Sequence, residues 1–112
     1  MVDDDDAVRE ATAALLSLHG FQIVEAADGV SALAQVRARH DIDAVIADFA
    51  MPRMNGAELA RQLRALRPDL PVLFMTGFAE LGALDDVPED FVLQKPIAES
   101  ELVARLDRLL PG

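Results

Sequence analysis

Short runs of apolar residues alternate along the chain with longer segments in which apolar residues recur every three or four positions. Residues 44–47 and 72–75 are uninterrupted apolar runs. Such runs are typical of parallel strands that are buried on both faces. Further strands are predicted over 21–26 and 91–94. Residues 1–2 precede the first acid and are too few for a strand of about five, so the first strand is predicted to be short.

The longer segments have the periodicity of amphipathic helices. We predict one helix between Asp6 and His19, and others over about 30–39, 56–66 and 99–110. The residues predicted to face the core are Val8, Ala11, Leu15 and Leu18 in the first helix, Val30, Leu33, Ala34 and Val36 in the second, Leu59, Leu63 and Leu66 in the third, and Leu102, Val103, Leu106, Leu109 and Leu110 in the last.

Residues at the helix ends support these assignments. Asp5 or Asp6 is suited to cap the first helix and Asp28 the second, because a carboxylate can accept hydrogen bonds from free backbone N–H groups. Gly20 suits the left-handed conformation that follows many helices. His19 is interpreted as a helix-end residue and not as a catalyst, because spacing identifies no acid or cysteine as its partner.

The helical pattern is weakest between Thr76 and Lys95. Residues 79–84 offer fewer than two turns of helix, Gly82 disfavours even these, and Pro88 prevents their continuation. We therefore expect a short fourth helix.

Polar side chains of distinct chemistry stand where the predicted strands end. In an open α/β sheet, ligands bind outside the carboxyl ends of the strands. These residues are therefore the candidate functional set. In chain order they are Asp3 and Asp4, Asp48, Thr76, and Lys95.

Composition narrows the class of protein. A length of 112 residues fits a single domain spanning 1–112, and a hydrophobic fraction of 52% is ample for one core. The formal charge of −10 argues against direct binding to nucleic acid or to an anionic membrane surface. No apolar run approaches the roughly 18 residues of a membrane span. The chain has no cysteine, which excludes disulfides and thiolate metal sites and fits a cytoplasmic location.

Four consecutive acids, Asp3, Asp4, Asp5 and Asp6, stand near the start of the chain. One interpretation is a solvated surface at the start of a helix. The other is a cation site, because carboxylate oxygens are hard ligands that suit Mg²⁺ or Mn²⁺. Composition does not decide between them.

The ordered set of strand-end residues resembles the receiver domain of two-component response regulators, a CheY-like superfamily. The resemblance covers essentially the whole chain, and although each motif is short, the ordered set is specific. The matching segments are Asp3-Asp4, Asp48 with Met51-Pro52 and Met54-x-Gly56, Thr76-Gly77, and Lys95-Pro96.

The resemblance implies a flavodoxin-like (βα)5 fold of the α/β class. This fold is a three-layer sandwich whose parallel five-stranded sheet has the order 2-1-3-4-5. Here the first strand would be shortened and the fourth helix weak. Neighbouring first and third strands would bring Asp3 and Asp4 beside Asp48. By resemblance, Asp4, Asp48 and the backbone carbonyl of Ala50 would bind Mg²⁺ (Mn²⁺ is an alternative) directly, and Asp3 would act through water.

The function implied is that of a phosphoacceptor signalling domain, not an enzyme. Asp48 would take a phosphoryl group from a phosphohistidine on a sensor histidine kinase or histidine phosphotransfer protein, while Lys95 supplies positive charge. The Thr76 hydroxyl would turn toward the phosphoryl group and pass the change to a downstream protein target. A homodimer is compatible with this function.

Two alternatives remain open. Many receivers carry Tyr or Phe three residues before the lysine, where this chain has Val92. Together with the short first strand, Val92 favours a degenerate receiver that acts as an interaction module without phosphorylation. The other alternative is an aspartate-based phosphatase, in which a second acid usually stands two residues after the nucleophile; that position is Ala50 here.

Overall fold

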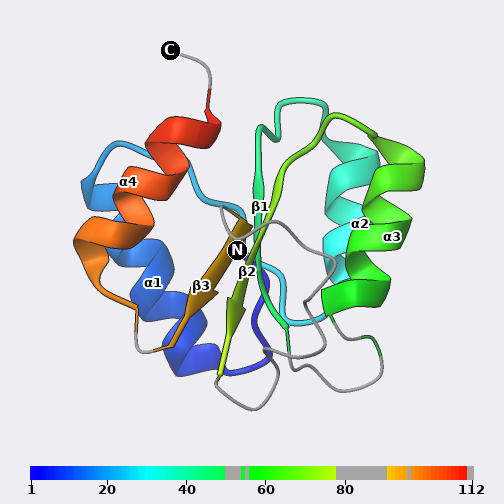
Figure 1. Ribbon diagram of the computed structural model, residues 1–112. Helices are drawn as coiled ribbons and strands as arrows, with labels where there is room; N and C mark the ends of the chain where they lie inside the picture. The colour runs from blue at the N-terminus through cyan, green and yellow to red at the C-terminus, as the bar shows by residue number, and fades with distance from the viewer. Residues whose placement is uncertain (50–53, 55, 78–90, 96, 111–112) are drawn as a thin grey trace.

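The computed structural model describes residues 1–49, 54, 56–77, 91–95 and 97–110. Figure 1 shows a central sheet with α1 and α4 on one face and α2 and α3 on the other. The predicted helix over 79–84 lies outside the described residues. In chain order the described elements are α1 (Asp6–Leu18), α2 (Gly29–Ala38), β1 (Val45–Asp48), α3 (Gly56–Leu66), β2 (Val72–Thr76), β3 (Val92–Gln94) and α4 (Glu99–Leu109).

The described strands form a parallel sheet in the order β1-β2-β3. Isolated parallel bridges extend it beyond β1, where Val2 pairs with Ala47 and also with Ala26. From one side of the sheet to the other, the order is therefore Ala26, Val2, β1, β2 and β3. This is the predicted order 2-1-3-4-5, and the short first strand is confirmed.

The predicted strand over 21–26 was wrong in its extent, since Ala26 alone forms a bridge there. The Met1 ammonium donates to Val24 O at 2.9 Å, Ala26 N donates to Met1 O at 2.9 Å, and Asp3 N donates to Ala26 O at 3.1 Å. A ladder needs a partner of similar length. The brief first strand gives 21–26 too few backbone groups with which to pair.

Side chains of β2 alternate between two apolar clusters, one on each face of the sheet. Val72 and Phe74 pack in the cluster beneath α2 and α3, while Leu73 and Met75 pack in the cluster beneath α1 and α4. Every residue of β1 and β2 is buried. This confirms the prediction of parallel strands that are buried on both faces.

The buried face predicted for α1 was wrong. Val8 and Leu18 are 43% and 88% exposed, whereas Leu16 is fully buried together with Ala13. Arg9, whose side chain is 12% exposed, turns toward the carbonyl of Asp3 and donates to it at 2.9 Å. Positions 9, 13 and 16 share one helix face, so the helix presents that face to the interior.

The other helix faces follow the prediction, apart from a few predicted core residues that are exposed. The core side chains of α2 and α3 are buried as expected, but Val30 is 63% and Leu66 38% exposed. Both stand in the first or last turn of their helix, where fewer neighbours can cover them. Ala34 is also exposed. The buried members of the predicted sets are Leu33, Val36, Leu59, Leu63, Leu102 and Leu106, whereas Leu15, Val103, Leu109 and Leu110 are half-buried.

The predicted helix ends are confirmed. The Asp5 carboxylate accepts from Val8 N at 3.1 Å, the Asp28 carboxylate accepts from Ser31 N at 2.7 Å, and Gly20 has a φ of 93°.

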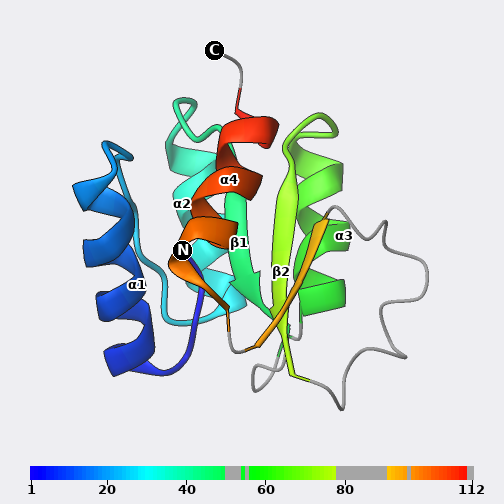
Figure 2. The same cartoon turned by 60° about the vertical axis from the view of Figure 1, so that its left-hand side comes forward.

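His19 does have an acidic partner, which spacing did not identify. Its Nε2 lies 2.8 Å from Glu99 Oε1, 80 positions along the chain. This contact joins the end of α1 to the start of α4, which lie together on one face of the sheet (Figure 2).

Candidate phosphoryl-acceptor site

Asp48, Thr76 and Lys95 lie at one edge of the sheet, because each ends or directly follows one of three parallel strands. Lys95 Nζ lies 3.0 Å from Asp48 Oδ1. The backbone N–H of Lys95 donates to Thr76 O at 2.7 Å, which fixes the end of β3 against the end of β2. The structure thus brings these three predicted residues together.

Three carboxylates converge at the same edge. Asp3, Asp4 and Asp48 each offer one oxygen, and these oxygens all lie within 4.8 Å of one another. Asp3 and Asp48 are 1% and 7% exposed, while Asp4 is open to solvent. The pairing of Val2 with Ala47 places the acids that follow Val2 beside the end of β1.

The environment of Asp3 is unfavourable for a carboxylate. One oxygen, Oδ1, accepts from Asp5 N at 2.9 Å, but Oδ2 is buried without a hydrogen-bond partner among the described residues. Burial is the main cause that raises the pKa of Asp3. The charges of Asp48 and Asp4 raise it further, against the lowering effect of the bond from Asp5 N.

The donor set fits a hard divalent cation such as Mg²⁺. All three side chains offer carboxylate oxygens, and the unpartnered Asp3 Oδ2 would be stabilised by a nearby positive charge. The backbone carbonyl of Ala50, predicted as a direct ligand beside Asp4 and Asp48, lies outside the described residues.

The side chain of Thr76 is buried, and its hydroxyl donates to Gly77 O at 3.1 Å. This bond orients the hydroxyl toward its own loop, beside the edge that carries Asp48.

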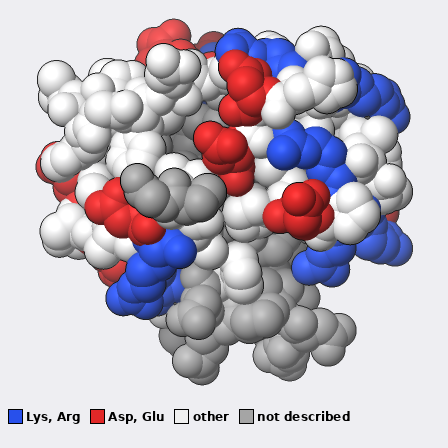
Figure 3. Space-filling view, turned by 90° about the horizontal axis from the view of Figure 1, so that it is seen from above, with Lys and Arg blue, Asp and Glu red and all other residues white. Residues whose placement is uncertain are grey.

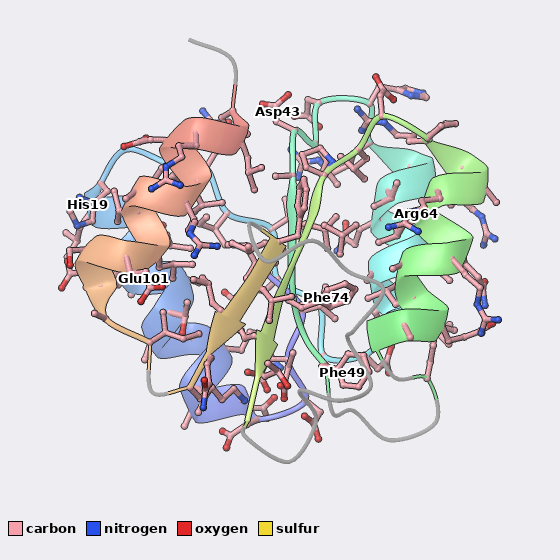
Figure 4. All side chains as sticks on the ribbon, in the orientation of Figure 1. His19, Asp43, Phe49, Arg64, Phe74 and Glu101 are labelled. Atoms are coloured by element: carbon pink, nitrogen blue, oxygen red, sulfur yellow. The ribbon has the colours of Figure 1, made fainter. Side chains whose placement is uncertain are left out.

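An aromatic pair supports the residue that follows Asp48. Phe49 and Phe74 meet edge to face, with ring centroids 5.9 Å apart and planes at 82° (Figure 4). Gly56 N donates to Phe49 O at 2.8 Å. A Cβ at position 56 would stand 3.0 Å from the backbone of Phe49 and from the ring of Phe74. The glycine of the predicted motif therefore allows α3 to begin close against the segment after Asp48.

Sequence reasoning missed Arg9, which donates to the carbonyl of Asp3 and so lies beside the acids. The face shared by Arg9, Ala13 and Leu16 was a second helical pattern in α1, and it could have revealed an inward-facing arginine. The more extensive apolar series at Val8 and Leu18 concealed it.

Replacing Asp3 by Asn is expected to raise the free energy of unfolding of the metal-free chain at neutral pH, by on the order of 1 kcal/mol, because a buried and incompletely paired charge is removed. The pKa of Asp3 is raised from the ordinary value of 3.8, so the folded state holds the proton more tightly than the unfolded state. The penalty in the wild type is therefore full above the raised pKa and is relieved as pH falls toward 3.8.

Urea denaturation with EDTA at a series of pH values measures this effect. Asp4→Asn is the matched control, since Asp4 is exposed and its replacement should change stability little. A loss of stability in Asp3→Asn at neutral pH would contradict the prediction.

The opposite end of the molecule has a different charge pattern. Figure 3 looks onto it and shows basic side chains gathered at the side where α2 and α3 lie, with acids among them. Arg39 pairs with Asp41 at 2.9 Å, and Arg67 donates to Ile42 O at 2.7 Å. The acid cluster beside Lys95 is thus a feature of the other end of the sheet.

Comparison with known proteins identifies the fold and the family. The family model of the response regulator receiver domain matches residues 1–107. The response regulator MprA of Mycobacterium leprae is 46% identical, over 97% of this chain and 49% of the relative. MprA of Mycobacterium bovis is 42% identical, over 98% of this chain and 49% of the relative. The chain therefore spans about half the length of these curated relatives.

Solved structures agree. A receiver domain protein from Clostridium thermocellum superposes with a TM-score of 0.91 at 22% identity, covering 96% of this chain and 89% of that one, which shows the fold. The receiver domain of the hybrid histidine kinase CckA superposes with a TM-score of 0.79 at 34% identity, covering 98% and 95%.

None of the described helices combines the length and the hydrophobicity that a membrane span requires. Receiver domains are signalling domains that interact with histidine kinases and effector domains. The match over residues 1–107, together with relatives and solved structures of the same kind, shows that this chain belongs to the response regulator receiver domain family.

Proposed function

We propose that residues 1–112 form one receiver (response regulatory) domain that accepts a phosphoryl group on Asp48 within a two-component phosphorelay. The observation that carries this proposal is the setting of the Asp48 carboxylate. It lies 3.0 Å from the Lys95 ammonium and within 4.8 Å of oxygens of Asp3 and Asp4. A nucleophile, a cationic side chain and a set of cation ligands therefore share one edge of the sheet.

The proposed reaction is a transfer between two side chains. An oxygen of the Asp48 carboxylate attacks the phosphorus atom of a phosphohistidine. As the O–P bond forms, the P–N bond breaks, and the imidazole nitrogen keeps the electron pair and takes up a proton from solvent. With acetyl phosphate as donor, the bond that breaks is P–O and acetate leaves.

Lys95 and the neighbouring acids have complementary roles in this transfer. The ammonium of Lys95, which already contacts Asp48, attracts the negatively charged phosphoryl oxygens. Asp3, Asp4 and Asp48 would hold Mg²⁺, with Mn²⁺ as a substitute. The bound ion supplies neutralisation of the charge on the phosphoryl group.

Thr76 is proposed to convert phosphorylation into a change of shape. Its hydroxyl would exchange the carbonyl of Gly77, 3.1 Å away, for a phosphoryl oxygen. This rotation would alter the loop that follows β2, and a protein target would read the altered surface.

The proposed partners are a sensor histidine kinase or a histidine phosphotransfer protein as donor, and a protein target downstream. The domain would promote its own phosphorylation and dephosphorylation and catalyse no other turnover. The proposed location is the cytoplasm. No direct contact with nucleic acid or with a membrane is proposed.

A degenerate receiver that binds partners without phosphorylation is the second candidate. The brief first strand and the half-buried Val92, in place of an aromatic residue, favour it. The presence of Asp48, Thr76 and Lys95 at one edge supports the first candidate instead.

Incubation with acetyl phosphate and Mg²⁺, followed by intact-protein mass spectrometry, separates the two candidates. The phosphoacceptor is expected to gain the mass of one phosphoryl group, and to gain nothing when EDTA replaces Mg²⁺. A wild-type chain that stays unmodified, although folded, would favour the degenerate receiver.

A further inference from the structure

Arg9 contacts three separate parts of the chain around the acid cluster. Its Nη1 donates to the backbone carbonyl of Asp3 at 2.9 Å, its Nη2 lies 2.8 Å from Asp6 Oδ1, and its Nε lies 3.3 Å from Glu25 Oε1. The Arg9 side chain is 12% exposed, whereas those of Asp6 and Glu25 are 76% and 40% exposed, so the contact with the Asp3 carbonyl is the most protected of the three. A guanidinium can make them together because its donors point in different directions within one plane.

These contacts compensate for the brevity of the first strand. Asp3 is held on one side by the bond from its N–H to Ala26 O at 3.1 Å. Arg9 holds the same residue through its carbonyl and also binds Glu25, the neighbour of Ala26. The backbone of Asp3 is therefore fixed at both its N–H and its C=O.

The fixed backbone directs the carboxylate. Asp3 Oδ2 is buried without a partner among the described residues, and one oxygen of the same carboxylate lies within 4.8 Å of oxygens of Asp4 and Asp48. Without the bond to its carbonyl, Asp3 could turn its side chain toward solvent, where Oδ2 would no longer be buried without a partner. The contact with Arg9 opposes that movement.

We propose that Arg9 is a positioning residue for the cation site, which holds Asp3 and Asp4 beside Asp48 although it touches neither the cation nor the phosphoryl group. This inference rests on the proposed function, since it assumes that the three acids bind Mg²⁺.

The charge of Arg9 and its positioning role predict opposite effects. If Arg9 acted only as a nearby positive charge, its removal would strengthen Mg²⁺ binding, because one repulsive charge would be lost. If it positions the acids, its removal weakens binding, because the ligands are no longer held together. The sign of the change in affinity therefore distinguishes the two roles.

Calorimetric titration of the full chain with MgCl₂ tests the proposal. We expect Arg9→Ala to bind Mg²⁺ about 10-fold to 100-fold more weakly than the wild type, the range typical of residues that orient metal ligands. Arg9→Lys keeps the charge but loses the planar set of donors, so it is expected to show a smaller loss in the same direction. Arg39→Ala is the matched control. Arg39 also pairs with an acid, Asp41, which precedes β1 instead of following it.

The outcomes are separable. Wild-type affinity, or tighter binding, in folded Arg9→Ala overturns the proposal. If Arg9→Ala does not fold, wild-type affinity in Arg9→Lys overturns it. An equal loss in Arg39→Ala, whose partner Asp41 precedes β1, would assign the effect to a general disturbance of the fold and overturn it too. If the wild-type chain itself binds no Mg²⁺, the cation site of the proposed function is absent. That result contradicts the proposed function and is distinct from a failure of the role proposed for Arg9.

Discussion

Asp48→Asn is expected to abolish the gain of one phosphoryl group that the wild-type chain shows with acetyl phosphate and Mg²⁺. An amide oxygen is a far weaker nucleophile than a carboxylate oxygen, so no acyl phosphate forms. The substitution preserves size and shape at a buried position, and it removes one of three mutually repelling charges. The variant should therefore fold while losing the reaction completely.

Asp43→Asn is the matched control for this experiment. Asp43 stands at the opposite end of β1 from Phe49 and the acid cluster (Figure 4). The change in charge and chemistry is identical, yet modification by acetyl phosphate should be unaffected. Retention of the added mass in Asp48→Asn would place the acceptor elsewhere, and its loss in Asp43→Asn would indicate a general effect of charge.

Leu16→Ala is expected to lower the free energy of unfolding by about 2–5 kcal/mol, since it removes a fully buried side chain and leaves a cavity. Leu18→Ala makes the same replacement two residues later in the same helix, at a side chain that is 88% exposed. It should change stability by no more than about 0.5 kcal/mol. Helix propensity changes equally in both variants, so the difference between them reports burial.

Urea denaturation followed by circular dichroism measures both values. A domain of this size has a total stability of about 5–15 kcal/mol, so Leu16→Ala is best measured at low temperature, where the variant stays folded. A larger loss in Leu18→Ala than in Leu16→Ala would mean that α1 presents the face that the apolar spacing first suggested, and would contradict the structure.

The strand-end residues were predictable from the sequence because their placement depends on a simple rule. Apolar runs at β1 and β2 indicated buried parallel strands, and parallel strands end at one edge. The placement of Asp48 and Lys95 at the same edge follows from that rule. The neighbourhood of Asp3 required the strand order as well, and that order came from the family resemblance.

Features that depend on distant partners were not predictable in this way. The buried face of α1 carries Ala13 and Leu16 together with the contact of Arg9 with Asp3, and not the longer apolar series. The partner of His19 stands on another helix. The segment over 21–26 has the composition of a strand, but too short a neighbour to form one. In each case a tertiary contact decided between local patterns of similar strength.

The alternation of side chains along β2 has a consequence for how the domain comes apart. Phe74 belongs to one apolar cluster and Leu73 to the other. Detachment of either helical layer would therefore expose apolar side chains on one face of β2 to solvent. Amide hydrogens of β2 are thus expected to exchange with deuterium through global opening, and both layers to melt in one cooperative transition.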